Sequence, residues 1–203
     1  MNRSPFDLTM QNKSMDHKII AALERISQAF RVLLWNESKE LGLTPIQIQT
    51  LIFLRHHSVE KRKISYLATE LGVTKATISE TVKTLLEKAL IGKEYDPQDS
   101  RSFVIRLTPE GKKIAKQTGF FAGHIEKPIG RLEDADKETL FKSLTGIVHH
   151  LNQAGVIGIQ RMCFTCAYYA QDRDGTPHFC KLMNIPLRTQ DLRIDCPEHA
   201  PLH

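Results

Sequence analysis

The residues best suited to chemistry in this chain are its four cysteines, and all of them lie beyond residue 160. Cys163 and Cys166 form a Cys-x-x-Cys pair, which places two thiolates on one side of a tight turn, at about the separation that a tetrahedral metal ion requires. Cys180 and Cys196 follow at longer spacings and are candidates to complete the tetrahedron. Only two residues separate Cys196 from His199, so His199 is an alternative fourth ligand.

Several kinds of site fit this cysteine pattern. We favour a closed structural zinc site, because thiolates in a tetrahedron suit zinc. An iron–sulfur cluster that senses redox state or iron also takes four cysteine ligands, and a thiol–disulfide switch needs only a pair of thiols. The remaining interpretation is four unrelated small core residues, against which the clustering and the Cys-x-x-Cys pair argue. The pattern therefore predicts a metal site and leaves zinc and an iron–sulfur cluster as alternatives.

The cysteines belong to a C-terminal extension, residues 156–203, that is poor in apolar residues and carries aromatic ones. A segment of about forty residues with so little apolar surface does not bury enough of it to fold alone. We therefore expect a bound metal, or docking on the rest of the molecule, to hold this tail in place.

A second functional pattern spans residues 63–111 and predicts two short helices joined by a tight turn. The first helix is expected to begin near Ser65, a capping residue type, and to end at Gly72. Thr74 then caps a second helix, which places Ile78, Val82, Leu85 and Leu86 on a buried face. The opposite face is small and polar, as a helix in a DNA major groove must be. It carries Lys75, Ala76, Thr77, Glu80, Lys83 and Thr84.

A β-hairpin is predicted directly after these helices. Its strands are residues 91–95 and 102–107, joined by the turn-forming residues 96–100. Asp99 and Arg101 lie at its tip, where the guanidinium of Arg101 has the length to reach a minor groove or a phosphate. At these residues the chain resembles the MarR family of bacterial transcription regulators. The resemblance rests on Asp96-x-x-Asp99-x-Arg101, followed by Leu-Thr-Pro-Glu-Gly-Lys at residues 107–112.

The resemblance covers roughly residues 16–155 and implies a winged helix and a homodimer on a pseudo-palindromic DNA operator. We expect Lys75 and Lys83 to contact phosphates, Thr77 a base edge or a phosphate, and Arg101 the minor groove. Many relatives carry a basic residue where this chain has Glu80, so the resemblance does not predict the operator sequence. It also leaves the effector open, either a small molecule or a redox signal.

The remaining sequence predicts a mainly α fold with a small β-hairpin wing (α+β). Residues 1–15 lack periodicity and are expected to form a flexible arm, followed by a long amphipathic helix to Gly42. Thr44-Pro45 predicts the next helix start, and Thr108-Pro109 another, interrupted at Pro128 and Gly130. A last helix runs from residues 134–136 to about Gly155.

Composition limits the function further. A net charge of +5 over 203 residues permits nucleic-acid binding without requiring it. No apolar run approaches membrane-spanning length, and residues 1–18 lack the apolar centre of a signal peptide, so we expect a cytoplasmic protein without a membrane partner. We expect no enzyme, because paired carboxylates, a nucleophile elbow and a phosphate loop are missing from the sequence.

Two other functions fit the same residues. The tail could hold a cluster or a thiol pair that changes DNA affinity, which would make the chain a redox or iron sensor. In a different class, the chain would be a protein-interaction module with the winged helix as a docking surface and the tail as a zinc scaffold. A steep loss of DNA binding with rising salt would favour a DNA-binding regulator, because lysine and arginine contacts release counterions.

Overall fold

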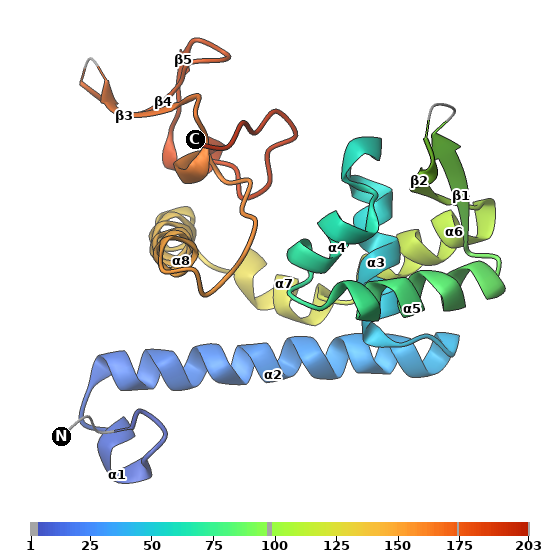
Figure 1. Ribbon diagram of the computed structural model, residues 1–203. Coiled ribbons are helices and arrows are strands. Elements are labelled where there is room, and N and C mark those ends of the chain that lie inside the picture. The colour runs from blue at the N-terminus through green and yellow to red at the C-terminus, as the bar shows by residue number, and fades with distance from the viewer. Residues whose placement is uncertain (1–3, 97–98, 174, 203) are drawn as a thin grey trace.

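The computed structural model describes residues 4–96, 99–173 and 175–202. Within these residues the fold is mainly helical, with a two-stranded and a three-stranded antiparallel sheet (Figure 1). The helices are α1 Leu8–Gln11, α2 Met15–Leu41, α3 Pro45–His56, α4 Ile64–Glu70, α5 Lys75–Glu87, α6 Pro109–Thr118, α7 Gly123–Gly130 and α8 Asp134–Gln153. The strands are β1 Ile91–Asp96, β2 Asp99–Leu107, β3 Tyr169–Arg173, β4 Thr176–Cys180 and β5 Ile185–Pro186. Short 3₁₀ turns lie at Val59–Lys61, Cys163–Thr165 and Thr189–Asp191.

The main hydrophobic core lies between α3, α4, α5, α6 and the wing formed by β1 and β2. Its fully buried apolar side chains are Ile48, Leu51, Leu54, Leu67, Ile78, Leu85, Ile105 and Ala115. The long helix α2 reaches this core near its C-terminal end, where Leu34 and Ser38 are buried, and the rest of α2 extends away from it (Figure 1). The predicted mainly α fold with a β-hairpin wing is confirmed.

Three predicted helix ends are confirmed by their capping bonds. Gly42 ends α2 in the left-handed conformation, with φ of +59°, which glycine adopts without steric cost. Thr44 begins α3 with a capping box, in which its hydroxyl accepts from the Gln47 N–H and the Gln47 side chain accepts from the Thr44 N–H. Thr74 caps α5 by accepting from the Thr77 N–H at 3.1 Å.

The predicted start of the first helix of the pair is confirmed to within one residue, but its predicted cap is wrong. This helix, α4, begins at Ile64, and its N-cap is Lys63, which makes no side-chain capping bond. Ser65 lies inside the first turn of the helix. The wing holds the chain just before α4, because the Ile105 N–H donates to the Arg62 carbonyl at 2.9 Å.

The helix after the wing also differs from the prediction. Its start at Thr108-Pro109 is confirmed, but α6 ends at Thr118, and α7 runs through Pro128 to Gly130. The break falls at residues 119–122, where Phe121 and Gly123 donate to carbonyls only three residues earlier. Such tight 3₁₀-type bonds, together with the poor helix propensity of Gly119, end α6 before the proline is reached.

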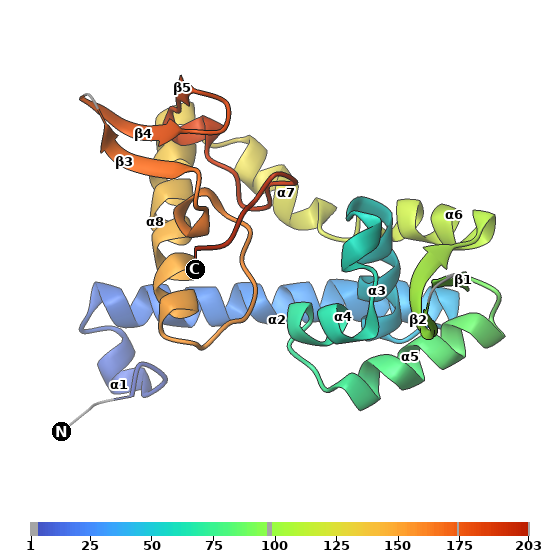
Figure 2. The ribbon, with the colours of Figure 1, turned by 45° about the horizontal axis from the view of Figure 1, so that its top comes forward.

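Both ends of the chain carry structure that the sequence pattern did not predict. The expected flexible arm contains the single turn α1, capped by Asp7, whose carboxylate accepts from the Thr9 N–H at 2.9 Å. The C-terminal extension contains the sheet β3–β4–β5, which lies beside α8 (Figure 2). Met162, Leu187 and Leu192 are the buried apolar side chains of this tail in the described part of the chain. None of the helices in the described part of the chain is long and apolar enough to cross a membrane.

Candidate nucleic-acid interface and cysteine pocket

The predicted recognition helix α5 presents a polar face to solvent. Ile78, Thr81, Val82 and Leu85 are buried, which fixes the rotation of the helix about its axis. The side chains of the opposite face are exposed, except Thr84, which is half-buried. The exposed ones are Lys75, Ala76, Thr77, Ser79, Glu80 and Lys83. The predicted buried and exposed faces of α5 are therefore observed, and Ser79 is an exposed member that the prediction did not include.

Some polar groups of this face form hydrogen bonds or ion pairs within the face itself. The Thr77 and Thr74 hydroxyls are 2.9 Å apart, and the Thr84 hydroxyl donates to the Glu80 carbonyl at 3.1 Å. The Lys83 ammonium lies 4.0 Å from the Glu80 carboxylate, with both side chains about two-thirds exposed. An exposed pair at this distance is held weakly, so Lys83 remains free to contact a phosphate.

The wing lies next to α5 and is rigid at its base. Strand β1 pairs antiparallel with β2 from Ile91 opposite Leu107 to Tyr95 opposite Phe103. On its surface, an ion pair joins Glu94 to Arg106, and the Lys93 ammonium lies 4.6 Å from the centre of the Phe103 ring. These exposed cations were not predicted as site residues. The side chains of Asp99 and Arg101 lie outside the described residues, so their predicted roles stay predictions.

The residues Leu-Thr-Pro-Glu-Gly at the end of the wing lock it to α6. The Thr108 hydroxyl donates to the Ala89 carbonyl at 2.9 Å and accepts from the Gly111 N–H at 3.1 Å. The Thr108 N–H donates to the Leu90 carbonyl. A Cβ atom at Gly111 would lie 1.9 Å from that same Leu90 oxygen, so only glycine fits. This motif therefore positions the wing relative to α6.

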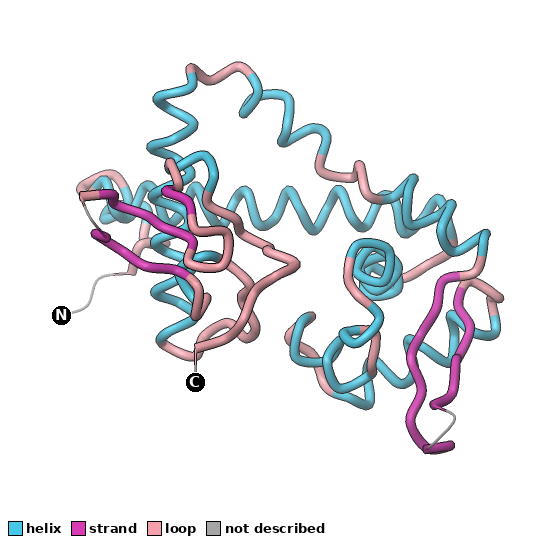
Figure 3. Tube along the Cα trace, turned by 90° about the horizontal axis from the view of Figure 1, so that it is seen from above, coloured by secondary structure: helices cyan, strands magenta, loops and turns pink. Residues whose placement is uncertain are grey.

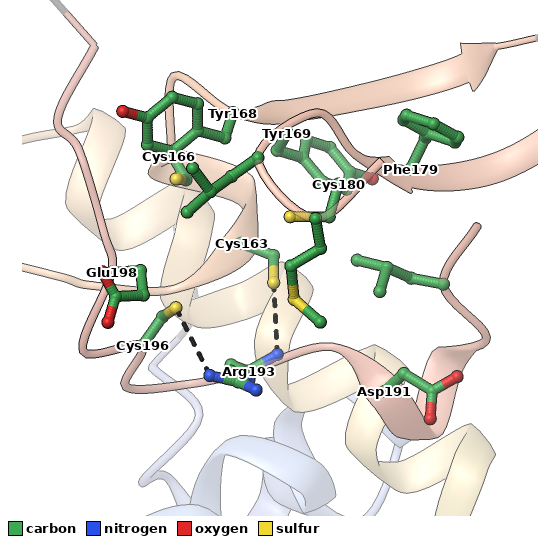
Figure 4. A pocket seen from close by; sticks show the side chains of 13 residues that line it. Cys163, Cys166, Tyr168, Tyr169, Phe179, Cys180, Asp191, Arg193, Cys196 and Glu198 are labelled. Carbon is green, nitrogen blue, oxygen red and sulfur yellow. Dashed lines mark hydrogen bonds between the residues drawn. The ribbon is translucent and has the colours of Figure 1, made fainter. Parts of the chain in front are cut away.

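The four cysteines line one pocket in the tail (Figure 4). Cys163 and Cys166 flank a 3₁₀ turn closed by the Cys166 N–H donating to the Cys163 carbonyl at 3.0 Å. Cys180 ends β4, and Cys196 lies in the last loop, close to Arg193 (Figure 4). The Arg193 N–H donates to the Cys163 sulfur at 3.3 Å. Three segments distant in sequence thus bring together the four thiols that the sequence predicted as one ligand set.

The thiols are free and electrostatically coupled. Burial raises the pKa of Cys163, the Arg193 N–H opposes that rise, and the three other cysteines add to it. Negative charge on Cys163 is therefore disfavoured unless a nearby cation compensates it. As placed in the described part of the chain, no group of three or more His, Cys, Asp or Glu side chains is arranged to hold a metal ion. By its chemistry this set of four thiols nevertheless fits a thiolate-bound ion. Binding would require the four sulfurs to move closer to one another.

His199, the predicted alternative ligand, lies away from the cysteine pocket. Its Nε2 atom lies 2.9 Å from the Thr165 carbonyl and 3.0 Å from the Thr165 hydroxyl. It lines a different cavity, next to Arg161 and His149. Burial lowers the pKa of His199. In this arrangement His199 is hydrogen-bonded to Thr165, in the turn that begins at Cys163, and does not line the cysteine pocket.

The sequence did not predict a polar junction between the tail and the winged helix. Arg161 is buried, with 6% of its surface exposed, and its guanidinium contacts Glu70 and Tyr66 of α4 and Asp195 of the tail. Asp195 also lies 2.8 Å from Nε2 of His57, the C-cap of α3. No sequence signal marks Arg161, because its partners lie some 34 to 104 residues away along the chain.

In a comparison with known protein families, residues 41–102 match the MarR family. HTH-type transcriptional repressor YetL of Bacillus subtilis (strain 168) is 28% identical over 114 residues, which cover 55% of this chain and 67% of YetL. The S. aureus MepR–DNA complex has a TM-score of 0.56 at 25% identity, covering 64% of this chain and 96% of MepR.

Two further solved structures share the fold. S. aureus MepR in its DNA-binding conformation has a TM-score of 0.57 at 24% identity, covering 66% of this chain and 98% of that chain. A MarR transcriptional regulator from Methanosarcina mazei Go1 has a TM-score of 0.55 at 19% identity, covering 65% and 94%. Residues 41–102 therefore match the MarR family, and about two-thirds of the chain has the fold of these MarR-type transcriptional regulators.

Proposed function

We propose that the chain is a cytoplasmic repressor that binds a pseudo-palindromic operator in double-stranded DNA. The observation that carries this proposal is the polar, solvent-facing side of α5, held by a buried opposite face next to a wing with exposed cations. The relative YetL is named a repressor, and MepR is seen with DNA, which supports the same function here.

In this proposal each exposed group has a distinct role. Lys75 and Lys83 contact phosphates, and Thr77 contacts a base edge or a phosphate from the first turn of α5. Glu80 accepts from a cytosine amino group or orients Lys83, from which it is separated by 4.0 Å. Arg101 enters the minor groove from the wing tip, near Asp99. Ala76 and Thr84 complete the surface that faces the bases.

Uncovered apolar surface supports a homodimer. In the fully described helices α7 and α8, Thr145 is the one buried residue, although α8 is amphipathic. Large apolar side chains on α2, α7 and α8 face solvent in a single chain. They are Ile19, Ile20, Ile26, Phe30, Val32, Trp35, Ile129, Leu140, Leu144 and Ile147. Exposed apolar residues in such number often mark an interaction surface, and in this proposal a second copy of the chain, related by two-fold symmetry, covers them.

The tail is proposed to bind one structural zinc ion through Cys163, Cys166, Cys180 and Cys196. Support comes from four free thiols lining one pocket, from the Arg193 N–H donated to the Cys163 sulfur, and from the mutual repulsion that a cation would offset. When bound, zinc supplies a tetrahedral cross-link with no open position. Metal content and the visible spectrum of protein purified without air test this site. Colourless protein with about one zinc per chain supports it, and brown, iron-containing protein would establish a cluster instead.

DNA binding is tested with a duplex selected from a random-sequence library by the intact protein. The logarithm of the binding constant should fall linearly with the logarithm of salt concentration, and Lys83→Ala should reduce that slope by about one unit. Lys113→Ala is the matched control, because Lys113 is also an exposed lysine in a weak pair with a glutamate three residues away, but on α6. Equal slopes for both variants would contradict the assignment of Lys83 to a phosphate. Failure to select any duplex would contradict DNA binding itself.

A further inference from the structure

The buried guanidinium of Arg161 joins the tail to the first helix of the helix–turn–helix. Its Nη1 donates to the Glu70 carboxylate at 2.7 Å and to the Tyr66 hydroxyl at 2.9 Å, and its Nη2 donates to the other Glu70 oxygen at 2.9 Å. A two-pronged arginine–carboxylate contact of this kind fixes both distance and orientation. Glu70 is the last residue of α4, immediately before the turn that leads to α5.

The other side of the junction belongs to the tail and to α3. Asp195 receives hydrogen bonds from Nε and Nη2 of Arg161, and its carboxylate contacts His57. The His57 ring stacks on Phe53 of the core at a centroid separation of 3.8 Å, and this contact fixes the position of His57. Arg161 thus ties the tail to the ends of two helices that frame the recognition helix.

The same tail segments carry two of the four cysteines. The Cys196 N–H donates to the Arg161 carbonyl at 2.9 Å, and the Cys163 N–H donates to the Arg193 carbonyl at 3.0 Å. Arg161 and Asp195 are directly paired in a parallel β-bridge. Residues 161–163 and 193–196 therefore form one pair of hydrogen-bonded segments. This pair places Cys163 and Cys196 at the pocket, and it places Arg161 and Asp195 against the winged helix.

The junction pairs buried charges. The Arg161 side chain is only 7% exposed and that of its partner Glu70 16%. Removing one partner of a buried ion pair is strongly destabilising, because the remaining group stays desolvated and unpaired. Movement of the tail away from α4 would therefore leave Glu70 without its buried partner.

We infer that Arg161 is a positioning residue for DNA binding, and that the junction makes the placement of α4, and thereby operator affinity, depend on closure of the four-cysteine pocket. The inference rests on the proposed function, since it assigns to the proposed zinc site a regulatory effect on the proposed DNA contacts.

The test measures the affinity of the full-length chain for the selected duplex, with and without a zinc chelator. Arg161→Met should weaken binding at least about tenfold, chelation should weaken the unmodified protein by a similar factor, and the two together should not add. Arg188→Met is the matched control, because Arg188 forms an exposed ion pair with Asp191 within the tail and does not contact α4. It should behave as the unmodified protein does in both conditions.

Wild-type affinity in Arg161→Met would overturn the inference, and so would additive losses from the substitution and the chelator. If Arg161→Met does not fold, the isosteric Glu70→Gln removes the charge of the partner without removing its shape. If the unmodified protein binds no duplex, the proposed function fails, and hydrogen exchange then decides the inference without DNA. Faster exchange of the α4 amides after either change supports the junction, and unchanged exchange overturns it.

Discussion

Single residues in this molecule are specified by close backbone approaches as much as by side-chain chemistry. Gly111 carries no functional group, yet its Cα hydrogens face the Leu90 carbonyl, and any Cβ there would lie 1.9 Å from that oxygen. The Thr108 hydroxyl and N–H hold the same stretch of backbone at Ala89 and Leu90. The spacing of threonine and glycine in the wing motif is therefore a requirement for joining β2 to α6.

Replacing Gly111 by alanine should lower the free energy of unfolding by about 3 kcal/mol, because a backbone oxygen cannot move aside as a flexible side chain can. Gly92→Ala is the control: Gly92 is on the same hairpin, and an added Cβ would meet no atom within 4 Å. It should change stability by less than about 1 kcal/mol. Urea denaturation followed by circular dichroism measures both variants. Equal stability of the two would mean that the wing does not hold α6 in this way.

At the scale of elements, the sequence predicted those features that depend on residues close together in the chain. The caps at Gly42, Thr44 and Thr74, and the buried face of α5, follow from residue types within a few positions of each other. Ser65 was wrongly predicted as the cap of α4, whose N-cap is Lys63 and makes no side-chain capping bond. The Arg161 junction was not predicted, because its geometry exists only when segments distant in sequence meet.

The tail was only partly predictable. Its cysteine spacing indicated one shared site, and all four thiols do line one pocket, but nothing in the pattern indicated a three-stranded sheet or docking on α8. That docking is aromatic: the Phe164 ring lies 5.7 Å from His149 of α8 and 5.3 Å from Tyr169 of β3. Such contacts depend on tertiary geometry, and no periodic pattern in the sequence predicts them.

Metal removal should act on the tail before it acts on the core. The tail buries few apolar side chains, so without a cross-link we expect residues from about 161 onward to lose protection from hydrogen exchange. The amides of α3 and α5 should stay protected, because the side chains of these helices form the main core. Exchange measured by mass spectrometry on the full-length chain, before and after chelation, provides the comparison.

Two substitutions refine that test of the tail. Cys196→Ser should reproduce the effect of chelation, because it removes one ligand of a closed shell. His199→Ala should leave metal content unchanged, since His199 is hydrogen-bonded to Thr165 and does not line the cysteine pocket. Equal protection of the tail with and without metal would show that docking on α8 alone holds it in place.

At the scale of the whole molecule, the wing and the tail sheet lie on opposite sides, and α2 extends along the length of the molecule (Figures 1 and 3). A single chain leaves the apolar sides of α2 and α8 uncovered, while its winged helix has a complete core. This division of packing is expected of a molecule whose DNA-binding part folds within one chain and whose long helices need a second one.

The proposed dimer predicts a specific failure when charge is placed on the uncovered face of α8. Leu140, Leu144 and Ile147 recur at spacings of four and three, so they form one stripe along the helix, and each is about 40% exposed in the single chain. Leu144→Glu should shift the protein from dimer to monomer in sedimentation velocity and weaken operator binding, because a two-fold operator needs both wings. Lys142→Glu also introduces a negative charge, but exposed Lys142 lies two positions away, on roughly the opposite side of the helix, so this variant should remain dimeric with unchanged helix content. A dimeric Leu144→Glu variant would show that α8 is covered by something other than a second copy, and a monomeric unmodified protein that still binds its full operator would remove the dimer from the proposal.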